Sequence, residues 1–193
     1  MNTRDLLVGP ALVLCIALAA CAPHSNLPDL GSVPSFQLIA QDGQPFSSDA
    51  LKDKVWVADF IFTTCSGPCP RMSSLMHRLQ NRLLQSPALR DQVRMVSVTV
   101  DPAHDTPEVL AEYSTHFRAR AGFWFFLSGP AESIQKLSVD TFHINTVASP
   151  LEHSSRLILV DRRARIRGYY ESTDAAMLDQ LVEDIGQLRK ELF

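Results

Sequence analysis

The amino-acid sequence predicts an α/β protein with a mixed sheet flanked by helices. Segments with a strand pattern alternate along the chain with segments of helical period, and this order is typical of α/β folds. The run at 55–62 is almost entirely apolar and is short enough for a buried strand. The segment at 70–84 carries apolar residues at helical spacing, and a second strand-like run follows at 93–100. Such an order gives a sheet with helices on both faces.

The first elements are expected from residue 35 onward. A hairpin at 35–46 turns at Asp42-Gly43, and a strand follows at 55–62. The helix at 70–84 buries one face through its apolar residues, which are Met72, Leu75, Met76, Leu79 and Leu83. The two methionines are therefore predicted to lie in the core rather than to serve as thioether ligands.

The second half of the chain continues the alternation. A strand at 93–100 precedes a helix that opens at 105–108, where Asp105 is interpreted as a turn and cap residue and Pro107 lies in the first turn. A strand pair is expected around Asp161. The further strands are predicted at 123–127, 156–160 and 166–170, and the further helices at 130–139 and 174–192. Together these elements follow a thioredoxin-like plan.

Two cysteines lie where the strand at 55–62 turns into the helix, in the segment FTTCSGPCP at 62–70. If the residues beyond Cys65 are helical, Cys65 and Cys69 lie about 40° apart on one face with a rise of about 6 Å. They could then bind one soft metal ion or each other. A helix N-terminus favours anions, so at least one thiol is expected to have a depressed pKa. The alternative is two buried structural cysteines, which the glycine and prolines of this turn disfavour.

The N-terminus has the pattern of a secretory signal. An apolar stretch of fifteen residues follows Arg4 and is too short for a membrane span. It ends in LAAC at 18–21, which resembles the lipobox of bacterial lipoproteins, in which the cysteine is acylated. We therefore expect a signal peptide at 1–20, a lipidated tether at 21–34 that begins with Cys21, and one domain at 35–193. An ordinary signal peptide or an uncleaved anchor is the alternative.

The predicted lipid anchor places the mature protein outside the cytoplasm on a bacterial membrane, on the periplasmic side if there are two membranes. Cys15 is removed with the signal and Cys21 carries the lipid, so Cys65 and Cys69 remain as the thiol pair in an oxidising compartment. Hydrophobic residues make up 46% of the chain, charged residues 20%, and the formal net charge is −3. This balance gives no indication of a nucleic-acid partner.

Three ordered motifs resemble the Sco/SenC family of copper chaperones over most of the mature chain. They are FTTCSGPCP at 62–70, SVTVDPAHDTP at 97–107, and His153-Ser154 before a strand that ends in Asp161. The resemblance implies a thioredoxin-like fold with an N-terminal hairpin and a copper ion bound by Cys65, Cys69 and His153. It also implies delivery of copper to a respiratory cytochrome c oxidase. The commoner family form has proline directly after the first cysteine, whereas serine stands there in this chain.

The chemistry of the residues agrees with such a site. Two thiolates select Cu(I), and one imidazole completes a three-coordinate site that could also accommodate Cu(II) with a fourth ligand. Zinc is the rival metal, but a closed structural zinc site needs four protein ligands. Binding should depend on pH because protons compete for the ligands. Asp101 is a candidate for a hydrogen bond that supports the metal loop.

Three functions remain open at this point. The first is a metallochaperone whose partners are a copper-accepting oxidase subunit or another copper protein, and the membrane. The second is a thiol-disulfide oxidoreductase in which Cys65 and Cys69 reduce the cysteines of a copper-accepting partner. Copper retention should need His153, whereas disulfide exchange need not. The third is a peroxiredoxin-like peroxidase, suggested by Thr63-Thr64-Cys65 but lacking the proline usual before that motif.

Overall fold

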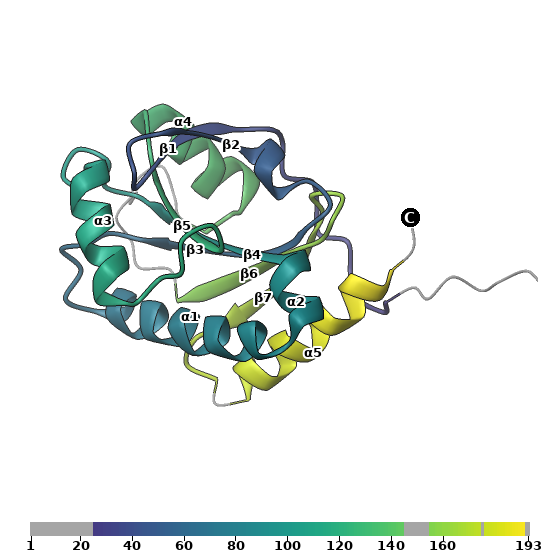
Figure 1. The fold of residues 1–193 in the computed structure, drawn as a ribbon. Coiled ribbons are helices and arrows are strands. Elements are labelled where there is room, and N and C mark those ends of the chain that lie inside the picture. The colour runs from purple at the N-terminus through teal and green to yellow at the C-terminus, as the bar shows by residue number, and fades with distance from the viewer. Residues whose placement is uncertain (1–24, 145–154, 175, 192–193) are drawn as a thin grey trace, which may run out of the picture.

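The computed structural model describes residues 25–144, 155–174 and 176–191. Seven strands form one mixed sheet in the order β2-β1-β5-β4-β3-β6-β7, and helices cover both of its faces (Figure 1). The predicted α/β class, the thioredoxin-like arrangement and the N-terminal hairpin are confirmed. The strands are β1 (Gln37–Ala40), β2 (Pro45–Ser47), β3 (Val55–Ile61), β4 (Val93–Thr99), β5 (Trp124–Ser128), β6 (Arg156–Val160) and β7 (Ile166–Glu171).

The predicted helices are present to within a few residues at their ends, and two short helical elements, at 48–51 and 87–92, were not predicted. The predicted helix at 130–139 is a short α-helix that continues directly into a π-helical turn. The helical elements are η1 (Ser48–Leu51, a 3₁₀-helix), α1 (Pro68–Gln85), α2 (Pro87–Gln92), α3 (Pro107–His116), α4 (Ala131–Gln135), η2 (Lys136–Thr141, the π-helical turn) and α5 (Met177–Lys190).

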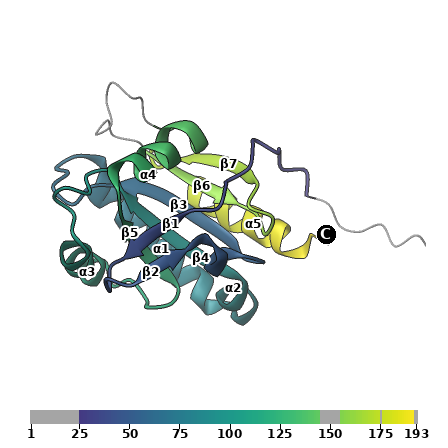
Figure 2. The same ribbon diagram turned by 90° about the horizontal axis from the view of Figure 1, so that it is seen from above.

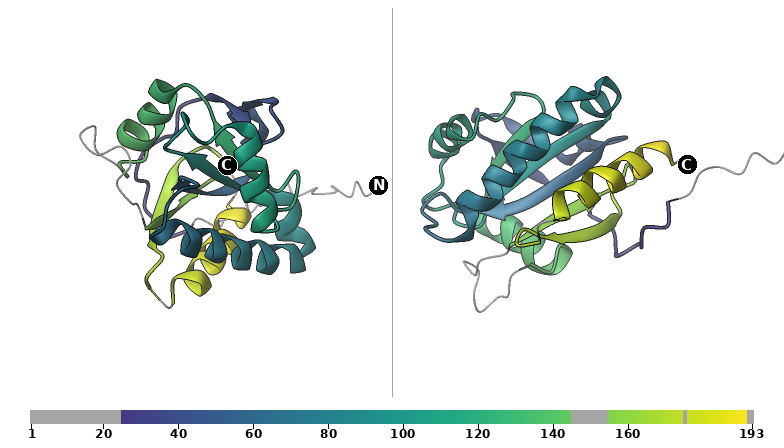
Figure 3. Two further views of the ribbon diagram at one scale, coloured as in Figure 1. Left: turned by 90° about the vertical axis from the view of Figure 1, so that its left-hand side faces the viewer. Right: turned by 90° about the horizontal axis from the view of Figure 1, so that it is seen from below.

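The two faces of the sheet carry separate cores, and β3 contributes to both. Val57 and Ile61 pack with α1, α3 and α5 on one face, whereas Trp56 and Phe60 pack with the hairpin and the α4–η2 segment on the other. Seen from below the sheet, α1 and α5 run over the same face, while the view from above shows α4 on the other (Figures 2 and 3). Strand residues alternate between faces, so Asp59 lies on the α1 face.

The register of the strands defines two ends of the sheet. β3, β4 and β5 are parallel, so the loops after them meet at their carboxyl ends, which we call the cysteine end. β6 is antiparallel to β3, and Val160 pairs with Trp56. The β6–β7 turn therefore lies at the opposite end of the sheet. Ile61 lies five positions after Trp56 in β3, so the two ends are about 17 Å apart along this strand.

The N-terminal segment at 25–33 falls within the predicted tether. In the structure it is held against β7 and the end of α5. Leu30 N–H donates to Ile166 O (2.9 Å), and Val33 N–H donates to Ala164 O (2.8 Å). Buried Arg167 donates to Pro28 O (2.8 Å) and forms ion pairs with Asp161 and Glu191. Backbone hydrogen bonds and the buried Arg167 side chain thus hold residues 25–33 in place.

The predicted signal peptide at 1–20 and the lipid site at Cys21 lie outside the described residues, so they and the domain boundaries stay predictions. Within the part of the chain that the structure describes, no helix combines the length and the apolar character needed to cross a membrane.

Candidate metal centre

The two cysteines lie at the cysteine end, in the connection from β3 to α1. The helix begins at Pro68, where a proline is tolerated because it lacks only an N–H that would have no intrahelical partner. Cys69 is in the first helical turn, but Cys65 lies in the preceding loop, where its N–H donates to Phe62 O (3.2 Å). The helical geometry considered for the residues beyond Cys65 is therefore wrong, because α1 starts three residues later.

The loop nevertheless brings the two thiols together. Cys65 is 6% exposed and Cys69 is 2% exposed, and both belong to the core on the α1 face. Both are thiols rather than halves of a disulfide, and a hydrogen bond joins their side chains. Two sulfurs in contact could bind one metal ion or form a disulfide after a small local movement.

Burial dominates the protonation of Cys69. Removal from water, and then the hydrogen bond with Cys65, raise its pKa to about 12. The pKa of Cys69 is therefore raised, whereas the helix N-terminus was expected to lower it. The helix end stabilises a thiolate by only about 1 kcal/mol, which is less than the cost of placing that thiolate in the core. The negative charge of Asp59 adds to the rise. A cation would therefore have to displace a proton here.

Asp105 holds the loop that precedes Cys65. Its side chain is fully buried and accepts hydrogen bonds from Thr63 N (3.0 Å), Thr63 Oγ1 (2.5 Å) and Thr99 Oγ1 (2.5 Å). His104 Nδ1 lies 3.2 Å from its Oδ1. The carboxylate thus ties the loop after β4 to a residue two positions before Cys65, and it fixes the backbone from which that thiol projects.

The predicted cap role of Asp105 is therefore wrong. The residue that caps α3 is Thr106, whose hydroxyl accepts from Val109 N, and Asp105 points inward instead. Asp101 forms the turn before it, since its carbonyl accepts from His104 N and Asp105 N. Support of the metal loop by the Asp101 side chain stays a prediction.

Asp59 is a second buried carboxyl group on the α1 face. It has no exposed surface, and burial raises its pKa to about 7. Ser97 Oγ donates to its Oδ1 (2.5 Å) and itself accepts from Trp124 Nε1 (2.9 Å). Its Oδ2 has no hydrogen-bond partner among the described residues. The sequence signal for this group was a single acidic residue inside an otherwise apolar strand.

Other side chains complete the surroundings of the thiols. Met72 and Met76 are fully buried in the same core as the cysteines, as their spacing predicts. Tyr113 of α3 hydrogen-bonds with Ser73 of α1 (3.0 Å), and burial raises the pKa of this phenol. A groove of about 220 Å³ beside the loop is lined by Thr63, Val109, Glu112, Tyr113 and His116.

The third predicted ligand, His153, lies outside the described residues. Across residues 25–144, 155–174 and 176–191, no three His, Cys, Asp or Glu side chains gather as a metal site. The described part thus supplies two sulfur ligands of the predicted three-coordinate site. The ligand set Cys65, Cys69 and His153 stays a prediction.

Comparison with known proteins gives consistent matches. The SCO1/SenC family model matches residues 27–189. A relative in Stutzerimonas stutzeri whose name refers to copper binding is 37% identical over 188 residues, 88% of each chain. The crystal structure of a SCO1/SenC family lipoprotein from Bacillus anthracis is 32% identical, with a TM-score of 0.73 over 81% of this chain and 94% of that one. BsSco, described as a Sco-family cytochrome c oxidase assembly protein with a disulfide switch, is 28% identical, with a TM-score of 0.73 over 84% and 96%.

Proposed function

This chain belongs to the SCO1/SenC family, and on that premise we propose that it is a membrane-anchored copper chaperone. Cys65, Cys69 and His153 bind one copper ion outside the cytoplasm, and the protein passes the ion to the copper centre of a respiratory oxidase or to another copper protein. Lipid on Cys21 holds the protein at the membrane. The observation that carries the proposal is the hydrogen-bonded thiol pair at the carboxyl end of β3.

The donor set supports copper as the cargo. Two thiolates are soft ligands that prefer Cu(I) over harder divalent ions. A site with two sulfurs and one imidazole leaves room for a ligand from an acceptor, so copper can move by ligand exchange. The hydrogen bonds of Asp105 to Thr63 keep the loop backbone in place while ligands change.

Anaerobic Cu(I) titration of the reduced mature protein against a competing chelator tests the proposal. One ion should bind per chain. Loss of a supporting residue lowers metal affinity about 10–100-fold, so His153→Ala, which removes a ligand, should lower it by at least that much. His77→Ala is the matched control, because His77 lies on α1 and contacts Asn81. The proposal fails if the wild type retains no more copper than a Cys65→Ser, Cys69→Ser double variant.

Thiol-disulfide exchange is the second candidate function, and the direct contact between the two thiols favours it. In that role the pair reduces a disulfide of a copper-accepting partner: one thiolate attacks, a mixed disulfide forms, and the second thiol releases it as the pair becomes oxidised. His153→Ala should leave this turnover unchanged while weakening copper binding. A protein that turns over against a thiol reductant but retains no copper assigns the oxidoreductase role alone.

A further inference from the structure

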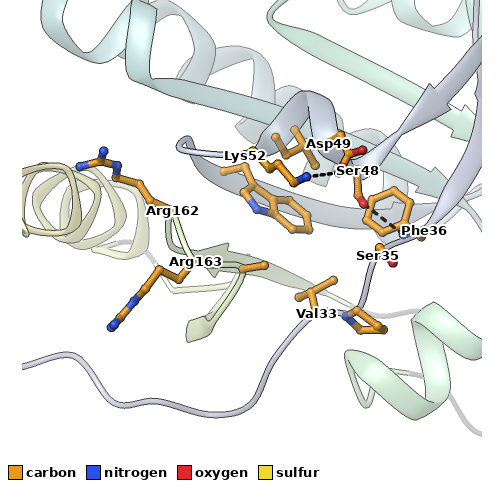
Figure 4. Close-up of a pocket in the computed structure, with 12 residues that line it drawn as sticks. Val33, Ser35, Phe36, Ser48, Asp49, Lys52, Arg162 and Arg163 are labelled. Atoms are coloured by element: carbon orange, nitrogen blue, oxygen red, sulfur yellow. Dashed lines mark hydrogen bonds and ion pairs between the residues drawn. The ribbon is translucent and has the colours of Figure 1, made fainter. Parts of the chain in front are cut away.

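A cavity of about 270 Å³ lies at the end of the sheet opposite the cysteines (Figure 4). Its floor is apolar and includes Val33, Phe36 and Trp56. Trp56 is near the start of β3, and Val33 ends the N-terminal segment that runs along β7. The cavity is therefore built where the N-terminal segment enters the domain, and it is separate from the metal centre.

The rim of the cavity is predominantly basic. Lys52, Arg162 and Arg163 line it, against a single acidic residue, Asp49, which pairs with Lys52 (2.7 Å). The guanidinium groups of Arg162 and Arg163 extend from the β6–β7 turn away from the ring of Phe36 (Figure 4). The whole chain has a formal net charge of −3, so a basic rim sets this end apart and favours an anionic partner.

The path of the chain places the predicted lipid anchor near the same end. Ser25 is held at the end of α5, where its N–H donates to Glu191 Oε1 (2.9 Å) and its hydroxyl accepts from Arg167 (3.0 Å). Cys21 lies four positions before Ser25 in the sequence, so its Cα atom can be at most about 14 Å from that of Ser25. Leu30, which is 45% exposed, adds apolar surface to this segment.

We propose that this end of the molecule is a docking surface for the anionic phospholipid headgroups of the membrane in which the chain is anchored. Lys52, Arg162 and Arg163 provide the positive surface, and the short connection to Cys21 keeps it against the bilayer. The cysteine end then faces away from the membrane. This inference rests on the lipid anchor at Cys21, which is part of the proposed function.

Trp56 supplies a probe for the test. The mature lipidated protein is reconstituted in phosphatidylcholine vesicles, with and without phosphatidylglycerol, that contain a headgroup nitroxide quencher. Tryptophan quenching should increase when the anionic lipid is present, and added salt should reverse the increase. Trp56 is only 3% exposed, but it lines the cavity and so lies close to a lipid headgroup that docks there. The increase should be absent in Trp56→Phe, because the remaining tryptophan, Trp124, does not line the cavity and packs in the core on the opposite face of the sheet.

Charge reversal separates docking from anchoring. One basic residue near an anionic surface strengthens binding about fivefold. The double variant Arg162→Glu, Arg163→Glu should therefore lower the ratio of docked to undocked protein by at least about 30-fold. It should also abolish the lipid-dependent quenching. Arg71→Glu, Arg78→Glu is the matched control: both arginines are exposed on α1, and the quenching should persist. Equal quenching with and without phosphatidylglycerol overturns the proposal, as does equal loss in the two double variants.

Two further readouts distinguish this inference from the proposed function. Flotation with neutral vesicles reports the anchor alone, and a protein that fails to float overturns the docking surface together with the anchor. Copper titration of the same preparation reports the metal centre. Arg162→Glu, Arg163→Glu should leave copper affinity unchanged, because the cavity lies at the far end of β3. If copper affinity falls in step with docking, the two ends are not independent and the proposed surface is refuted.

Discussion

Replacing Asp59 by asparagine should remove a pH-dependent loss of stability between about pH 4 and pH 7. Burial raises the pKa of Asp59 from its ordinary 3.8 to about 7 in the folded protein. Between these values the unfolded chain has released the proton while the native state retains it, so the native state binds more protons. Stability therefore falls as pH rises through this window.

The magnitude follows from the two pKa values. Each pH unit between them costs about 1.4 kcal/mol, so the ionised carboxylate costs about 4 kcal/mol above pH 7 relative to the protonated group. The amide introduced by Asp59→Asn retains an acceptor for Ser97, and, like the protonated acid, it places a donor where Oδ2 has no partner among the described residues. Near pH 4 the variant should thus match the wild type, and near pH 8 it should be more stable by up to about 4 kcal/mol.

Urea unfolding of the reduced, metal-free protein across this pH range measures the effect. The quantity of interest is the difference in unfolding free energy between Asp59→Asn and wild type, because other titrating groups cancel in it. Asp140→Asn is the control, since Asp140 is exposed on the π-helical turn. If the Asp59→Asn difference is the same at pH 4 and pH 8, the carboxyl group does not titrate in this window and the reasoning is refuted.

Three further variants test the supports of the site, of the N-terminal segment and of the core. Asp105→Ala leaves three donors of the partly buried Thr63 and the fully buried Thr99 without their acceptor. It should cost about 3 kcal/mol in urea unfolding and about 10–100-fold in Cu(I) affinity. Thr106→Ala, which removes the α3 cap, should cost about 1 kcal/mol and leave the affinity unchanged. Arg167→Met strands two buried carboxylates and should cost about 3–5 kcal/mol, with faster proteolysis before residue 34; unchanged proteolysis contradicts its role as a clamp. Met72→Ala opens a cavity in the core to which the cysteines belong and should cost about 2–5 kcal/mol in thermal unfolding. A cost below about 1 kcal/mol would place this side chain outside the packed core.

Local patterns were sufficient to predict most of the fold. The spacing of Met72, Met76, Leu79 and Leu83 predicts the buried face of α1, and all four side chains are fully buried. The first residue of α1 was harder to predict, because Pro68 and Pro70 both suit the first turn of a helix; the prediction began at Pro70, whereas α1 begins at Pro68. Composition alone predicts a tether before residue 35. The contacts that hold residues 25–33 come from Arg167 and β7, more than 130 residues away, and no local pattern reports them.

The position of the two cysteines in the candidate site could be predicted from the sequence, but the residues that support them could not. Cys65 and Cys69 stand out because they lie between the end of the strand pattern at 55–62 and the start of the helix pattern at 70–84. Asp105 has the local signature of a turn or cap, and its partner Thr63 is 42 residues away in sequence, so its inward direction depends on the parallel pairing of β3 and β4. Asp59 was visible as a lone charge in a buried strand, yet its raised pKa depends on packing against Ser97 and Trp124.

Burial of Cys69 has two consequences for copper binding. At neutral pH the raised pKa of Cys69 keeps this sulfur protonated, and a thiol reacts far more slowly than a thiolate with oxidants and disulfides. Binding of Cu(I) must displace that proton, so the proton offsets part of the strength of the sulfur–copper bond. Burial thus protects the Cys69 sulfur of the empty site from oxidation, and this sulfur holds copper less tightly than an exposed thiolate would. Both properties agree with the proposed role in copper delivery.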